Sequence, residues 1–218
     1  HGSAPGLSTT ATTQLELNQA SAWVGHKVAS AGDVNGDGYS DVIVGAYFYS
    51  NGQTDEGAAF IYHGSASGLS TTASAILESN QARAYFGYKV ASAGDVNGDG
   101  YSDVIVGASN YYNGPIDEGA AFIYHGSASG LSTTATTQLE SNQAYASFGA
   151  SVSSAGDVNG DGYSDVIVGD PYYDNGQTDE GAAFIYYGSA SGLSKNAAAL
   201  LEANQAGAAF GYSVASAG

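Results

Sequence analysis

The sequence predicts an all-β protein, a β-propeller-like array of four-stranded blades, and three observations support this. A 62-residue repeat runs through the chain without insertion or deletion: HGSAPGLS at His1 returns as HGSASGLS at His63 and His125, and as YGSASGLS at Tyr187. Each repeat divides into four short segments separated by turn residues. The composition includes 17 tyrosines among 218 residues and only 11% charged residues, as in many exposed β-proteins. Four strands per unit at even spacing are typical of a propeller blade.

The repeat defines one array over residues 1–218 with an incomplete blade at each end. Residues 1–22 end a preceding blade, residues 23–84, 85–146 and 147–208 form repeats 1, 2 and 3, and residues 209–218 begin a further repeat. The chain therefore holds about three and a half blades. A parallel β-helix would have a much shorter period, and beads on a string would show linkers. Because two middle strands of a fourth blade are absent, we expect either a piece of a longer propeller or a homo-oligomer, such as a filament of identical units.

The second repeat illustrates the expected elements in order. The first strand covers about residues 86–93, and the run DVIVGA at 103–108 suits a strand buried on both faces. A polar loop with tyrosines leads to GAAFIYHG at 119–126, which favours a third strand. The fourth segment corresponds to TTATTQLE at 133–140. Its last copy in the chain, AAALLEANQA at 197–206, also has good helix propensity, so the state of this segment stays open.

The loop between the first two strands, DVNGDGYSD, is identical in all three repeats. Calcium takes about six to eight oxygen ligands, and this loop offers side-chain oxygens at positions one, three, five and nine and a backbone carbonyl at position seven. Position twelve is valine rather than glutamate, so the loop is not an EF-hand. A polar Asx-rich turn without metal is the alternative. The expected ligands of three Ca²⁺ sites are Asp33, Asn35, Asp37, Tyr39 and Asp41; Asp95, Asn97, Asp99, Tyr101 and Asp103; and Asp157, Asn159, Asp161, Tyr163 and Asp165.

The order Phe148-Gly149, aspartate loop and Val168-Gly169-Asp170-Pro171 resembles the FG-GAP repeat of integrin α-subunit propellers and of many bacterial secreted proteins. The resemblance covers essentially the whole chain. It implies a seven-bladed propeller, calcium in the first hairpin loop of each blade and ligand binding on the opposite face. Val24 stands where the family has Phe, Asp170 stands where it has Ala, and the first two copies lack the Pro. None of these departures is at an expected metal ligand.

Charge and composition restrict the partners. The 21 acidic and 4 basic residues give a net charge of −17, which would repel nucleic acid and anionic membrane surfaces. No apolar run reaches the roughly 18 residues needed for membrane insertion, and the chain has no cysteine. We expect an extracellular or cell-surface calcium-binding protein with an adhesion, recognition or structural, self-assembling role.

Aromatic residues gather between the second and third strands of each repeat: Tyr47, Phe48, Tyr49, Tyr111, Tyr112, Tyr172 and Tyr173. They could bind a protein or glycan ligand, although packing between blades is favoured because propellers need aromatic wedges there. The pairs Asp55-Glu56, Asp117-Glu118 and Asp179-Glu180 occur in every repeat, whereas an active site is normally made once, so a turn role is expected. No unique cluster of acid, base and nucleophile is present, and the chain is not expected to be an enzyme. The alternative is a secreted enzyme-associated or carbohydrate-binding propeller.

Overall fold

The computed structural model describes residues 2–3, 6–7, 10–114 and 117–216. These residues form β-strands and turns and contain no helix. The strands are β1 Gly2–Ser3, β2 Gly6–Leu7, β3 Lys27–Gly32, β4 Asp41–Ala46, β5 Ala58–Tyr62, β6 Ala75–Glu78, β7 Phe86–Gly94, β8 Asp103–Ala108, β9 Ala120–Tyr124, β10 Thr137–Leu139, β11 Ser151–Gly156, β12 Asp165–Asp170, β13 Ala182–Tyr186 and β14 Ala199–Glu202.

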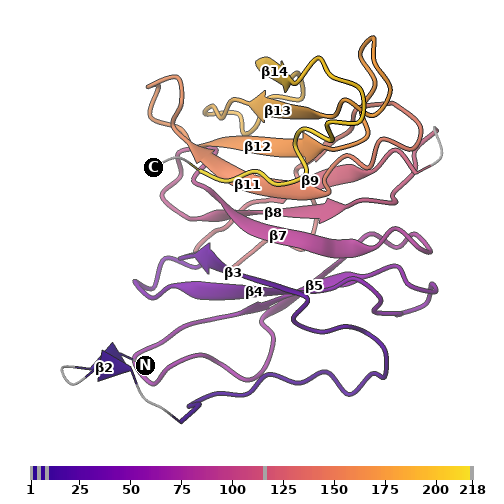
Figure 1. The fold of residues 1–218 in the computed structure, drawn as a ribbon. Coiled ribbons are helices and arrows are strands. Elements are labelled where there is room, and N and C mark those ends of the chain that lie inside the picture. Colours follow the sequence, from indigo (N-terminus) through magenta and orange to yellow (C-terminus); the bar gives the residue numbers. More distant parts are fainter. Residues whose placement is uncertain (1, 4–5, 8–9, 115–116, 217–218) are drawn as a thin grey trace.

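Each repeat folds into one antiparallel sheet whose strands follow chain order. The sheets are β3-β4-β5-β6, β7-β8-β9-β10 and β11-β12-β13-β14, and β1 and β2 pair separately. Figure 1 shows the three sheets stacked in chain order, from β3–β6 at one end of the stack to β11–β14 at the other. The predicted all-β fold of four-stranded blades is therefore confirmed.

The second strand of each blade lies in the interior, as its sequence predicts. All six residues of β8 are buried, and the predicted range 103–108 is the observed one. Val106 pairs with Phe122 on β9 and with Val90 on β7, so the strand is enclosed laterally as well as on both faces. This burial explains why the run contains β-branched residues without the alternation of a half-exposed strand.

Successive blades meet at the Phe-Gly pair, where their backbones touch. A Cβ atom built on Gly107 would lie 2.1 Å from the carbonyl oxygen of Gly149, so only glycine fits. The N–H of Phe148 donates to the carbonyl oxygen of Glu118 at 2.8 Å, and Gly119 and Phe148 form a parallel bridge. The joint between the first and second blades has the same contacts, so the array keeps a constant register.

Fourth strands close the apolar core between blades. Leu77 of β6 and Leu139 of β10 are 0% and 2% exposed, respectively, and each belongs to a cluster with residues of the following sheet. Leu15, one repeat before Leu77, packs on the first sheet in the same manner, although residues 10–22 form no strand. The corresponding segment of the third repeat is strand β14, which settles the open choice against a helix.

Candidate functional site

The meander topology places two kinds of loop at opposite edges of the stack (Figure 1). One edge, called here the aspartate edge, carries the three DVNGDGYSD loops that join β3 to β4, β7 to β8 and β11 to β12. The other, called here the variable edge, carries the loops from second to third strand and the chain that enters each first strand. A metal site at the aspartate edge and a ligand site at the variable edge would therefore lie one strand length apart.

The first aspartate of each loop organises the backbone around itself. The Oδ1 atom of Asp33 accepts the N–H groups of Gly36 at 2.7 Å and Asp37 at 3.1 Å, and its Oδ2 atom accepts that of Gly38 at 2.8 Å. Asp95 and Asp157 accept the corresponding bonds in their loops. The backbone bond from Gly162 lowers the pKa of Asp157, which favours the ionised form that a cation needs.

Positions three and five lie on the same tight turn. Asn35 accepts the N–H of Asp37 with Oδ1 and donates from Nδ2 to Oδ2 of Asp37, both at 3.1 Å. The Oδ1 atom of Asp37 also accepts the N–H of Tyr39 at 2.9 Å. A carboxylate oxygen has two lone pairs, so these bonds leave acceptor capacity at Asp33 and Asp37.

Position nine has a second role that sequence reasoning missed. Asp41 is fully buried; its Oδ2 atom accepts the N–H of Val34 at 2.9 Å and its Oδ1 atom that of Gly64 at 2.8 Å. Asp103 and Asp165 are held in the same way. Burial raises the pKa of Asp103 to about 6. This aspartate pins the loop to the turn after the third strand, whereas the sequence suggested only a metal ligand.

Positions seven and eight contribute contacts between blades. The Tyr101 ring packs so closely on Gly36 that a Cβ atom added to this glycine would lie only 2.6 Å from the ring. Tyr163 packs equally closely on Gly98. Ser102 accepts the N–H of Asp33 with Oγ at 3.1 Å and donates its own N–H to the Asp33 carbonyl oxygen at 2.9 Å. The loops are therefore linked to one another along the aspartate edge.

The donor chemistry suits calcium, because the loops offer only oxygen ligands. Among the residues that the structure describes, however, no three acidic or histidine side chains converge in a group that could hold a metal ion. Positions one, three and five present their side chains together on the turn, whereas Asp41 is fully buried beneath it and is hydrogen-bonded to the N–H groups of Val34 and Gly64. The expected ligand set therefore fits a calcium site in part, and the residues at positions one, three and five fit it best.

At the variable edge, two side chains that are the same in every repeat hold the loop backbone. Glu56 is fully buried and accepts the N–H of Asn51 at 2.6 Å, and desolvation raises the pKa of Glu56. Gln19 bonds both backbone groups of Ser50 at 2.8 Å, and Gln81 does the same to Tyr112. The turn role predicted for the acidic pairs agrees with the geometry of Glu56. The glutamine was missed, and its presence in every repeat was the available signal.

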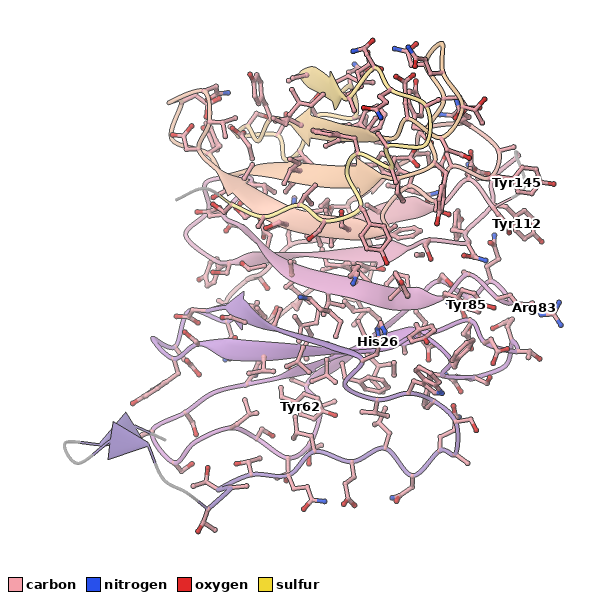
Figure 2. The ribbon with its side chains drawn as sticks, viewed as in Figure 1. His26, Tyr62, Arg83, Tyr85, Tyr112 and Tyr145 are labelled. Carbon is pink, nitrogen blue, oxygen red and sulfur yellow. The ribbon has the colours of Figure 1, made fainter. Side chains whose placement is uncertain are left out.

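The loop aromatics divide into packed and exposed residues. Tyr49, Tyr111 and Tyr173 pack edge-on against phenylalanines of the third strands at 5.2 to 5.3 Å. Tyr47 is 8% exposed, whereas Tyr112 and Tyr172 are 53% and 46% exposed. Figure 2 shows Tyr112 pointing away from the stack. Packing explains the first group and leaves the second free for another role.

Stacked four-stranded meanders, each with an aspartate loop in its first hairpin, define a repeat protein of the β-propeller blade type. The model of the FG-GAP repeat matches residues 24–62, 86–124 and 148–186, together more than half of the chain. The chain therefore belongs to the FG-GAP repeat family.

Individual relatives are integrin α subunits. The chain is 37% identical over 164 residues to integrin alpha-IIb of Mus musculus, a match covering 72% of this chain and 16% of that protein. It is 37% identical over 140 residues to integrin alpha-6 of Homo sapiens, covering 63% of this chain and 12% of that protein. The chain thus spans less than one sixth of the length of these relatives. Within the described residues, no helix has the length and apolar character required to cross a bilayer.

Proposed function

We propose that this chain is an extracellular recognition module whose blades are stabilised by calcium at the three aspartate loops. The observation that carries the proposal is the identical wrapping of each loop around its first aspartate, which groups oxygen-bearing side chains at positions one, three and five. In each loop the ion would be held by the side chains of positions one, three and five, here Asp33, Asn35 and Asp37, and by the backbone carbonyl of Tyr39. Asp41 would be the remaining ligand, and it also holds the loop in place through its backbone hydrogen bonds. Extracellular calcium modules bind at about 10⁻⁴ to 10⁻³ M.

The role of the ion is structural in this proposal. Asp33 and Asp37 place negative charge close together on one turn, and their repulsion opposes the hairpin. Calcium would neutralise this charge and cross-link the loop. Because Asp33 is hydrogen-bonded to Ser102 of the next blade, ordering one loop also favours the order of its neighbour.

The recognition role rests on family membership and on the separation of the two edges. The matched relatives are named integrins, and the variable edge carries exposed aromatic side chains opposite the aspartate loops. We infer a protein or glycan ligand at that edge and a non-enzymatic, cell-surface or secreted location.

Thermal unfolding with millimolar calcium and with excess chelator tests the metal sites. We expect calcium to raise the melting temperature by several degrees, since a ligand that binds only the folded state at ten times its Kd adds about 1.4 kcal/mol per site. The triple variant Asp37→Asn, Asp99→Asn, Asp161→Asn should lose most of this increase. An unchanged melting temperature on calcium addition to the parent protein would refute the proposal.

A matched change separates the ligand role from the supporting role. Asp41→Asn replaces one carboxylate oxygen by an N–H donor facing a backbone N–H, so it should destabilise the protein even in chelator. Asp37→Asn alters an exposed side chain and should have little effect in chelator. Equal destabilisation by both variants in chelator would show that position five is only a turn residue.

A further inference from the structure

Differences between the nearly identical repeats are concentrated at the variable edge. Eight positions of the repeat take a different residue in all three copies, and six of them lie at this edge. Four of the six surround the joints between blades: Arg83, Tyr145 and Gly207, with Ser21 in the segment before the first repeat; Trp23, Tyr85 and Ser147; Phe48, Asn110 and Tyr172; Ser50, Tyr112 and Asp174. The nine residues of each aspartate loop show no variation.

These variable residues line the same pocket in successive blades. The first pocket has a volume of about 540 Å³ and is lined by Ser21, Trp23, Phe48 and Ser50. The second has a volume of about 440 Å³ and is lined by their counterparts Arg83, Tyr85, Asn110 and Tyr112. Each pocket also contains an unvarying aspartate, Asp55 in the first and Asp117 in the second.

The frame of each pocket is fixed. Gln19 and Gln81 occupy both backbone groups of Ser50 and Tyr112, and Glu56 and Glu118 hold the following residue. Variable side chains are therefore displayed on loops that have the same backbone bonds in each blade. A rigid frame with changing side chains is the usual design of a binding surface.

Backbone strain gives a second, independent indication. Arg83 and Tyr145 have φ values of 60° and 64°, and Trp23 and Tyr85 have values of 53° and 55°. Bulky residues rarely adopt this left-handed region, whereas glycine does so freely. Gly207 occupies the position of Arg83 and Tyr145 in the third repeat, with a φ of 70°. Large side chains at strained positions indicate that they serve something other than stability.

We propose that the variable edge binds an extended neutral polysaccharide, with alternate sugar units of one polymer seated in the pockets of successive blades. This inference rests on the proposed function, because it names the ligand of the same recognition surface. Trp23 and Tyr145 are 58% and 63% exposed, and aromatic rings of this kind stack on the C–H faces of sugars. Asp55 and Asp117 supply acceptors for hydroxyl groups. Figure 2 shows Arg83, Tyr112 and Tyr145 along this edge.

Charge disfavours an acidic polymer at this edge, and backbone bonding disfavours a peptide bound as an added strand. The net charge of −17 repels a polyanionic glycan. A peptide bound as an added strand would need free backbone groups, but those of Ser50 and Tyr112 are already occupied by glutamines. Stacked sheets lie about 10 Å apart, which is about twice the length of one sugar unit in an extended glycan, so every second unit of the polymer would reach the next pocket.

Affinity gel electrophoresis with soluble laminarin, glycogen, galactomannan and xyloglucan tests the proposal on the intact chain in millimolar calcium. We expect retardation by at least one polysaccharide, with little competition from its monosaccharide because binding to several pockets is multivalent. Trp23→Ala and Tyr112→Ala should each weaken binding about tenfold. Tyr187→Ala, which removes a 37% exposed tyrosine elsewhere, should leave it unchanged.

A gain-of-stability variant distinguishes binding from packing. Tyr145→Gly should keep or raise the melting temperature and still weaken polysaccharide binding severalfold, whereas a packing role requires the melting temperature to fall. The inference would be overturned if none of the polysaccharides retards the protein. It would also be overturned if the protein is retarded only in a gel that contains an unfolded polypeptide such as casein. Calcium stabilisation measured on the same samples would then show that the metal proposal stands independently.

Discussion

At the scale of single residues, Asp170 departs most clearly from the pattern of the repeat. Ala46 and Ala108 occupy this position in the other blades. Asp170 is fully buried, and neither carboxylate oxygen has a hydrogen-bond partner among the described residues. Desolvation raises the pKa of Asp170 to about 7, an effect that the nearby Ser141 hydroxyl opposes. The third blade therefore contains an acid that is neutral at low pH and costly when ionised.

The substitution Asp170→Ala should stabilise the protein at pH 8. Because the folded-state pKa is raised above the unfolded value, the parent protein loses stability as pH rises from about 4 through about 7. The loss is at most about 4 kcal/mol at about 1.4 kcal/mol per pKa unit. Urea unfolding of both proteins at pH 5 and pH 8 measures it. A difference between the two proteins that does not grow with pH would contradict the assignment.

The candidate metal residues show what a sequence can and cannot supply at this scale. Oxygen-bearing residues at positions one, three and five were predictable from spacing alone, and they lie together on each loop. The backbone bonds to Asp41 depend on Gly64, which is distant along the chain. Spacing within the loop carries no information on such a partner. The assignment of all fifteen residues as ligands stays a prediction.

At the scale of elements, strand type was predictable where burial dictates sequence. The range 103–108 is β8 without correction, and GAAFIYHG contains β9. The fourth strand was ambiguous because AAALLEANQA has helix propensity, and pairing of β14 with β13 overrides that propensity. Within residues 210–216, the only strand pairing in the described part of the chain is the parallel bridge of Phe210 to Gly181.

The glycine of the second strand should be the least tolerant position of a blade. Gly107→Ala would place a methyl group 2.1 Å from the Gly149 carbonyl oxygen, and the blades would have to separate. We expect destabilisation of about 3 kcal/mol. Gly52→Ala has free space around it but a φ of 102°, so it should cost about 1 kcal/mol. Chemical unfolding of both variants gives the comparison; similar losses would show that the joint adapts easily.

At the scale of the whole molecule, the middle blade is covered on both sides while the outer blades are not. Leu77 and Leu139 are 0% and 2% exposed, but Leu201 at the same position of the third blade is 43% exposed. On the other side, Val28 is 52% exposed whereas Val90 is buried. The exposed sheet of the third blade is where a further blade or another copy would pack. Self-association and the incomplete end blades remain predictions, for which the particle mass in light scattering is the test.

This asymmetry predicts a gradient of stability along the stack. In a repeat protein, stability is approximately the sum of the intrinsic terms of each repeat and of the interfaces between neighbours, so the blade with two interfaces should open last. Native-state hydrogen exchange should be slowest in β8 and β9 and faster in β13 and β14. Leu77→Ala should cost about 2 to 5 kcal/mol, while the matched Leu201→Ala should cost less than about 1 kcal/mol because its side chain already faces water. Uniform exchange across all three sheets, together with equal losses for the two leucines, would mean that the array unfolds as one unit and that the ends are protected by contacts with other copies.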